Sequence, residues 1–115
     1  RIRRYVQGET SVLRRGDVTL DLRDRKVTCG NKRHRLTPKL RDLLVYFMRH
    51  PGRDLSRKEI MQSVWDTEYV DDTRTLDVHI HWLRRAMEPD PKNPTHILTV
   101  RGVGYRFEPG GPEEA

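Results

Sequence analysis

The first third of the chain shows strand periodicity. Apolar and polar residues alternate over residues 18–22, and an inward apolar pair recurs at residues 27 and 29. A Gly-Asn turn at residues 30–31 leads to a further extended segment over residues 32–36. The pattern predicts a small antiparallel sheet, in which Cys29 is a core residue rather than a reactive thiol.

A helix is predicted to follow this sheet. Thr37 is a candidate N-cap, Pro38 suits the first helical position, and a Pro-Gly pair at residues 51–52 ends the helix. Apolar residues recur three and four apart between these signals: Leu40, Leu43, Leu44, Phe47 and Met48.

A second helix begins at a capping box. Ser56 and Glu59 have the required spacing, and Leu55 and Ile60 stand where a hydrophobic staple would close around the start. The apolar side continues through Met61, Val64 and Trp65. An acidic loop over residues 66–72 comes next.

A third helix is predicted over residues 73–87, before a proline-rich segment. At about 100° per residue, its core seam consists of Leu76, Ile80, Leu83 and Met87. The opposite face carries Arg74, Val78, His81, Trp82 and Arg85, and the flanks carry Thr75, Asp77, His79 and Arg84. Two short strands, residues 97–100 and 103–107, form a hairpin around Arg101 and Gly102. Two helices of helix-turn-helix type followed by a hairpin constitute a winged helix.

The outer face of the third helix differs from an ordinary solvated face. Val78 and Trp82 lie beside arginines, and water is a poor partner for both apolar groups. In a DNA major groove, arginine can bond to guanine and apolar groups can touch thymine methyls. The alternative is that Trp82 covers a neighbouring loop.

Composition and charge support one basic domain. The 115 residues are 34% hydrophobic and 35% charged, with a formal net charge of +6, which suggests a polyanionic partner. A single cysteine excludes an internal disulfide framework and favours an intracellular, cytoplasmic protein. There is no apolar run of membrane-spanning length and no signal-peptide pattern. The chain starts with arginine rather than methionine, so a fragment with a missing partner domain is expected.

Other classes of function have less support. No nucleophile motif or phosphate-binding glycine loop indicates an enzyme, and no cofactor is expected. His79 and His81 point about 200° apart on a helix and cannot chelate one metal ion. A membrane-surface role for the arginine-rich start lacks an apolar face. A protein-interaction module remains open, and it would bind duplex DNA without sequence preference.

Two segments resemble a known family. Residues 74–85 (RTLDVHIHWLRR) and 97–107 (ILTVRGVGYRF) closely resemble the OmpR/PhoB-type effector domain of bacterial response regulators, and residues 36–38, 55–59 and 64–65 fit the same pattern. The resemblance implies an α+β winged helix-turn-helix with an N-terminal four-stranded antiparallel sheet, three helices and a C-terminal hairpin wing. Residues 1–15 are rich in arginine and poor in apolar residues, which is typical of a linker or arm. A DNA-binding domain is expected at 16–108 and a disordered tail at 109–115.

The resemblance also implies a function and its residues. The third helix would enter the major groove of double-stranded DNA, and the wing would reach the minor groove through Arg101. The implied DNA-binding residues are Arg74, Thr75, Val78, His79, His81, Trp82, Arg84, Arg85, Thr99, Arg101 and Tyr105. The implied RNA polymerase contacts are Asp66, Glu68, Tyr69, Asp71 and Asp72. Such domains bind direct repeats as tandem dimers, and a phosphorylated receiver domain normally precedes them.

The sequence departs from the family pattern in two places. Leu40 and Arg41 stand where a glutamate and an aromatic residue are usual, so Thr37 has no capping-box partner, and Leu40 is expected to pack inward. Trp82 stands where a basic residue is common. Because indole cannot bond bidentately to guanine, we expect Trp82 to pack on a sugar or a thymine methyl and to shift the preferred DNA site.

Overall fold

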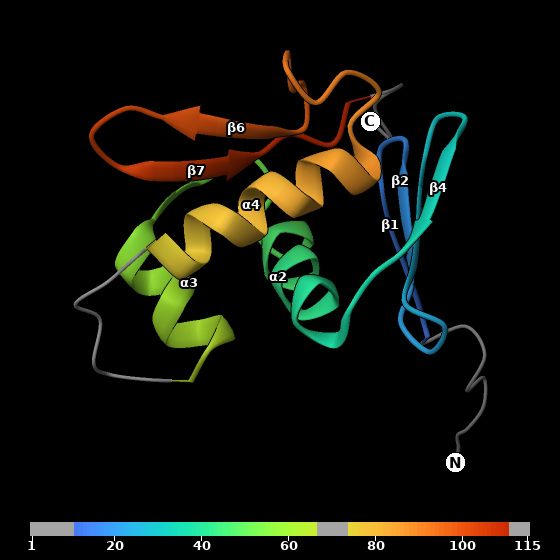
Figure 1. Ribbon diagram of the computed structural model, residues 1–115, viewed down its shortest axis with the longest axis horizontal. Helices are drawn as coiled ribbons and strands as arrows, with labels where there is room; N and C mark the ends of the chain where they lie inside the picture. The colour runs from blue at the N-terminus through green and yellow to red at the C-terminus, as the bar shows by residue number, and fades with distance from the viewer. Residues whose placement is uncertain (1–10, 67–73, 111–115) are drawn as a thin grey trace.

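The computed structural model describes residues 11–66 and 74–110, which form two antiparallel sheets and three helices (Figure 1). The first sheet contains β1 (Val12–Arg15), β2 (Val18–Asp21), β3 (Lys26–Cys29) and β4 (Lys32–Arg35). The helices are α2 (Pro38–Met48), α3 (Arg57–Val64) and α4 (Arg74–Met87). The second sheet contains β5 (Asp54–Ser56), β6 (Ile97–Val100) and β7 (Gly104–Phe107). This arrangement confirms the predicted α+β winged helix.

The N-terminal sheet has the order β1-β2-β3-β4, so each strand pairs with its neighbour in sequence. Val18 lies opposite Cys29 and Leu20 opposite Val27, and all four side chains are buried. The sheet therefore has one face in the core, as the alternation predicted.

Strand β1 corrects the expected linker. Residues 12–15 were expected to belong to an arm, but they pair along their whole length with β2. Leu13 packs against the core, while its neighbours Val12 and Arg14 are exposed. Pairing with β2 gives hydrogen-bond partners to the backbone N–H and C=O groups of this arginine-rich segment. The amino-acid composition of the segment does not reveal such a pairing.

Helices α2 and α3 begin at the predicted caps. The Thr37 side chain accepts a hydrogen bond from the amide of Leu40 (3.2 Å), and Leu40 itself is buried, as expected. At α3 the Ser56 hydroxyl accepts from the amide of Glu59 (3.1 Å), and the Glu59 carboxylate accepts from the amide of Ser56 (2.9 Å). The reciprocal capping box is thus present at the start of α3.

Strand β7 lies in the middle of the second sheet, which has the order β5-β7-β6. The three-residue strand β5 was not predicted, because its extended conformation depends on pairing with β7, about fifty residues later. Gly104 lies opposite Ser56, and a side chain there would collide with the carbonyl of Leu55. A glycine is therefore required where the wing approaches the start of α3.

The C-terminal segment is ordered further than expected. The amide of Glu108 donates to the carbonyl of His96 (2.8 Å), and the amide of Asp17 donates to that of Pro109 (3.4 Å). The predicted tail therefore packs against the domain at its first residues, and residues 111–115 lie outside the described part.

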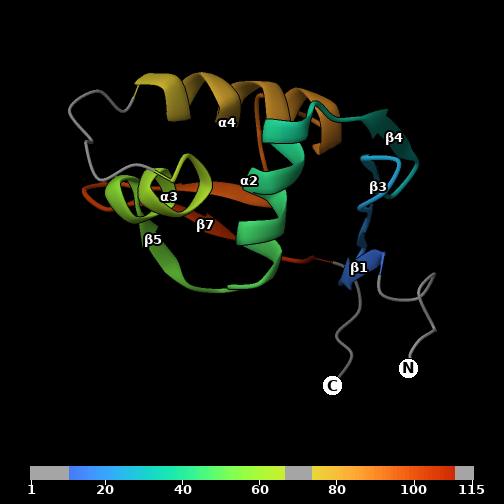
Figure 2. The ribbon, with the colours of Figure 1, turned by 90° about the horizontal axis from the view of Figure 1, so that it is seen from below.

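The arrangement of layers positions α4. Figure 2 shows α4 along one side of the molecule, with α2 and α3 beneath it and the N-terminal sheet at one end. In Figures 1 and 2 the β6–β7 loop lies at the other end, beyond the start of α4. Among the described residues, none of the helices has the length and apolar character needed to cross a membrane.

Candidate nucleic-acid interface

Helix α4 separates a buried seam from an exposed face. The predicted seam residues are buried: Leu76, Ile80, Leu83 and Met87 are at most 1% exposed. On the opposite face Val78 is 44% and Trp82 49% exposed, and the side chains of His81 and Arg85 are exposed too. Arg74 and Thr75 are exposed at the first turn. The helix therefore presents cationic, aromatic and aliphatic groups together.

Trp82 is the last of three aromatic rings in contact, which run from the end of α3 to the exposed face of α4. The His79 ring packs edge-on against Trp82, with centroids 5.2 Å apart, and against Trp65 of the α3 C-cap, at 5.0 Å. His79 Nδ1 donates to the carbonyl of Thr75 (2.8 Å), so the ring is fixed on its own helix. Trp82 rests on His79 with half of its surface exposed, and an open groove next to it runs along Thr37, Leu40, Arg85 and the strand β4.

Arg84 connects α4 to the wing. Its Nε donates to the carbonyl of Ile97 (2.9 Å), and its Nη2 donates to the hydroxyl of Thr99 (2.9 Å). The guanidinium carbon also lies 5.7 Å from the centroid of the Tyr105 ring. Burial lowers the pKa of Arg84, but an arginine keeps its charge at neutral pH. The expected phosphate ligand thus donates two hydrogen bonds inside the domain and keeps other N–H groups.

Tyr105 and Asp77 form a second connection between α4 and the wing. Tyr105 is only 5% exposed, and its hydroxyl donates to Asp77 Oδ1 (2.6 Å). Arg57, the first residue of α3, donates from Nε to the same oxygen (3.1 Å) and lies over the Tyr105 ring. Burial, then the hydrogen bond to Asp77, raises the pKa of Tyr105, and the hydrogen bond to Asp77 raises the pKa of Arg57. Tyr105 is therefore almost fully buried and hydrogen-bonded within the domain, and its place on or near a phosphate stays a prediction.

Sequence reasoning placed Asp77 on a flank of the third helix and gave it no role. Its partners lie 20 and 28 residues away in the chain, and no local motif relates them. Only the folded arrangement identifies Asp77 as the common acceptor of α3 and β7.

The wing ends in an exposed turn. The amide of Val103 donates to the carbonyl of Val100 (3.0 Å), and Arg101 is exposed between them. Thr99, on β6 two residues before Arg101, is also exposed. The structure thus leaves Arg101 accessible at the position where the sequence predicted it.

The predicted polymerase-contact loop is described only at its first residue. Asp66 is exposed and has a positive φ of 54°. Glu68, Tyr69, Asp71 and Asp72 lie outside the described residues.

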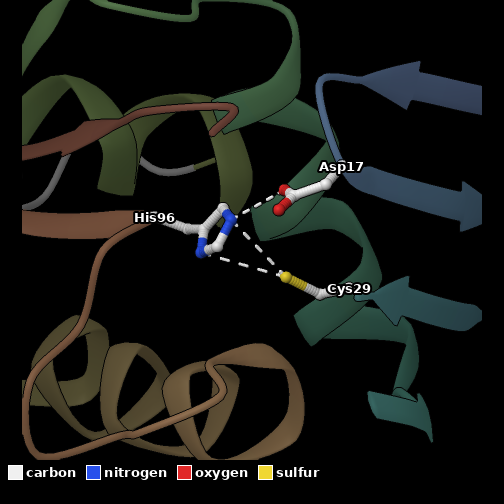
Figure 3. A group of neighbouring side chains, drawn as sticks. All are labelled: Asp17, Cys29 and His96. Carbon is white, nitrogen blue, oxygen red and sulfur yellow. Dashed lines mark hydrogen bonds and ion pairs between the residues drawn. The ribbon is translucent and has the colours of Figure 1, made fainter. Parts of the chain in front are cut away.

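A buried charged cluster lies away from the exposed face of α4. We call it the His96 cluster, and it consists of Asp17, Cys29, Glu88 and His96 (Figure 3 shows all but Glu88). Hydrogen bonds with Cys29, Glu88 and Asp17 outweigh burial and raise the pKa of His96 to about 11. Burial raises the pKa of Glu88, but its hydrogen bonds with His96 and three backbone amides outweigh it, and the net shift is downward. The strand alternation predicted Cys29 as a core residue but did not relate it to His96.

Comparison with known proteins assigns the family. Residues 31–107 match the protein family described as "Transcriptional regulatory protein, C terminal". The sensory transduction protein RegX3 of Mycolicibacterium smegmatis is 44% identical over 100 residues, covering 87% of this chain and 44% of RegX3. SphR of Synechococcus elongatus, an alkaline phosphatase synthesis regulator, is 42% identical over 97 residues, covering 84% of this chain and 38% of SphR. The chain therefore spans less than half the length of these relatives.

Solved structures agree with this assignment. The DNA-binding domain of RstA from Klebsiella pneumoniae, in a complex with the RstA box, superposes with a TM-score of 0.74 at 28% identity, covering 86% of this chain and 98% of that one. DrrB of Thermotoga maritima, an OmpR/PhoB homologue, gives a TM-score of 0.71 at 28% identity, covering 85% of this chain and 44% of that one. The family that these proteins share is one of transcription regulators and not of enzymes. The chain belongs to the C-terminal DNA-binding domains of transcriptional response regulators of the OmpR/PhoB type.

Proposed function

We propose that this domain binds double-stranded DNA sequence-specifically, with α4 in the major groove and the β6–β7 wing at the minor groove. The observation that carries the proposal is the composition of the exposed face of α4. Arg85 can bond to guanine or to phosphate, and Val78 can contact a thymine methyl, while the opposite seam holds the helix to the core. Arg74, Thr75 and His81 complete the face that meets bases or the nearby backbone.

Trp82 gives this face a specificity of its own. Its indole is half exposed and is supported from behind by the His79 ring. A supported aromatic plane suits a sugar or a thymine methyl better than a guanine edge, because the indole N–H is its only hydrogen-bonding group. We therefore expect the domain to select a thymine where relatives with a basic residue select another base.

Contacts to the DNA backbone fix the orientation. We assign His79 and Thr99 to the vicinity of phosphates, and Arg101 to the narrow minor groove, where negative potential attracts arginine. Arg84 and Tyr105 support these contacts from within, since the hydrogen bonds of both join α4 to the wing. Arg84 retains an N–H group that can reach a phosphate.

The partners are inferred from the family. We propose that two copies occupy direct repeats as a tandem dimer, and that the acidic loop around Asp66 contacts RNA polymerase. A receiver domain that controls the pairing would precede residue 1 in the full-length protein, and the protein would act in the cytoplasm.

The test is selection from a randomised duplex pool at about 150 mM salt, followed by sequencing of the retained DNA. We expect enrichment of a direct repeat whose half-sites lie about one helical turn apart. Arg85→Ala should weaken this enrichment. Arg23→Ala removes the same charge from the exposed β2–β3 turn and should leave the motif unchanged. Retention without any enriched motif would overturn the proposal and indicate an electrostatic anchor or a protein-interaction module.

A further inference from the structure

Three metal-binding side chains converge where the N-terminal sheet meets the wing. Within residues 11–66 and 74–110, Asp17, Cys29 and His96 are the group whose donor atoms all lie within 4.8 Å of one another. His96 Nε2 lies 2.8 Å from Asp17 Oδ1 and 3.5 Å from Cys29 Sγ. Figure 3 shows the imidazole ring pointing from the start of β6 toward the β1–β2 turn and the end of β3.

The thiol and the imidazole are shielded from bulk water. Cys29 is 1% and His96 4% exposed, whereas the Asp17 side chain is 36% exposed. A cation could therefore enter past the carboxylate, and it would then lose most of its hydration to protein ligands. This combination of one open and two buried ligands suits a bound ion better than a surface cluster of charges does.

Glu88 orients the imidazole from behind. Glu88 is fully buried, and its carboxylate accepts hydrogen bonds from the amides of Thr95, His96 and Ile97. The same carboxylate accepts from His96 Nδ1 (3.0 Å). A carboxylate on Nδ1 fixes the tautomer and leaves Nε2 for a metal, which is the usual outer-shell arrangement of a histidine that ligates zinc. Glu88 is thus a second, independent feature that points to a ligand at Nε2.

One of the donor distances agrees with tetrahedral zinc. Ordinary Zn–S and Zn–N bond lengths place the sulfur and nitrogen ligands of one tetrahedral zinc about 3.5 Å apart, and the Cys29 Sγ to His96 Nε2 distance is 3.5 Å. The other distances require movement. Cys29 Sγ also lies 3.9 Å from His96 Nδ1, so it stands beside the ring rather than in front of Nε2, and both the thiol and the Asp17 carboxylate have to shift toward an ion on Nε2. We propose that Asp17, Cys29 and His96 form a zinc site, with Glu88 as the residue that positions His96.

Zinc could replace two protons of the His96 cluster without a change in its net charge. Zn²⁺ would replace the proton on His96 Nε2 and the thiol proton of Cys29, so that two protons leave and the net charge of the His96 cluster is unchanged. Gly110 packs closely on the same side, and a side-chain carbon there would lie 2.8 Å from His96 Nε2, so any larger residue would crowd the site. A water molecule would complete the four ligands of the ion.

The site would join parts of the chain that are far apart in sequence. Cys29 and His96 are separated by 67 residues, and they belong to the N-terminal sheet and to the segment that leads into β6. Bound zinc would therefore fasten the wing to the sheet.

The test is a titration of the reduced 115-residue chain with Co²⁺, which replaces zinc and reports a thiolate ligand by its charge-transfer absorption. We expect one equivalent to bind, and Zn²⁺ to displace it. Cys29→Ser should remove the charge-transfer band. Asp17→Asn, a change at a partly exposed turn, should weaken the affinity by at least about tenfold, since even loss of an outer-shell partner costs that much.

The controls separate this site from others. His34→Asn alters an exposed histidine on β4 and should leave the band and the affinity unchanged. Circular dichroism establishes that each variant is folded, and Asp17→Asn keeps the test decisive if Cys29→Ser does not fold. A wild-type chain without a saturable thiolate band overturns the proposal, and so does a band that persists in folded Cys29→Ser or an affinity that Asp17→Asn leaves unchanged.

Discussion

Replacing Asp77 with alanine should destabilise the domain more than its exposed position on α4 suggests. Asp77 accepts hydrogen bonds from the Tyr105 hydroxyl (2.6 Å) and from Arg57 (3.1 Å), and so connects α4, β7 and α3. In the Asp77→Ala variant the Tyr105 hydroxyl, on a residue that is only 5% exposed, keeps no charged acceptor.

The magnitude follows from three contributions. The hydrogen bond from Tyr105 to a charged acceptor contributes about 1.5–3 kcal/mol to the free energy of unfolding. The ion pair with Arg57 contributes less than about 1 kcal/mol, because the two side chains are 37% and 41% exposed. Asp77 also lies in the first turn of α4, where a negative charge contributes about 0.3–1 kcal/mol. We therefore expect a loss of about 2–4 kcal/mol, or at least about 10 °C in Tm.

Urea unfolding at neutral pH measures this loss, and an unchanged slope would show that the unfolded state is unaffected. Tyr105→Phe and the double variant complete a cycle in which the coupling energy should be about 1–2 kcal/mol. Asp54→Ala is the matched control, since Asp54 forms an exposed ion pair with Arg106 and its loss should cost less than about 1 kcal/mol. If Asp77→Ala costs no more than Asp54→Ala, the assigned connection between α4 and the wing is wrong.

Four further substitutions test individual contacts. Ser56→Ala removes the capping box of α3 and should cost about 1–2 kcal/mol in urea unfolding, whereas Ser63→Ala, exposed in the same helix, should cost much less. Trp82→Arg should change the base preferred at one position of each half-site in the pool selection, and an unchanged motif would contradict the role of the indole. Arg101→Ala should weaken binding to the selected site by about tenfold in a fluorescence titration, and equal affinity would remove the wing from the interface. Arg84→Ala should lower the free energy of unfolding by about 1–2 kcal/mol. It should also lower the slope of log K against log salt for DNA binding by about one unit, and an unchanged slope would leave Arg84 a purely structural role.

Features with a local cause could be predicted from the sequence. The α3 capping box needs only Ser56 and Glu59 at the correct spacing, and the buried seam of α4 follows from helical periodicity. The inward packing of Leu40 also follows from its place in the apolar pattern of α2. In each case the residues that determine the structure lie within one or two turns of each other.

Features with distant partners could not be predicted. Strand β1 has the composition of a linker and becomes a strand only because β2 offers its backbone a partner, and β5 depends in the same way on β7. At the candidate interface, sequence patterns identified which side chains of α4 are exposed, but not which of them form hydrogen bonds within the domain. Arg84 differs from Arg85 and Arg101 only in what lies beside it in the fold.

The separation of the two faces of α4 has an evolutionary consequence. Val78 and Trp82 are about half exposed, while the seam behind them is closed to water, so substitutions on the outer face cost the core little. If the outer face reads DNA as proposed, one copy of a duplicated gene could acquire a new operator by changing a few outer residues while it still folds at every step. Asp77 lies on the same helix but holds α3 and the wing, so it should resist this divergence although it is partly exposed. A family of regulators can therefore diversify its DNA targets quickly on an unchanged scaffold.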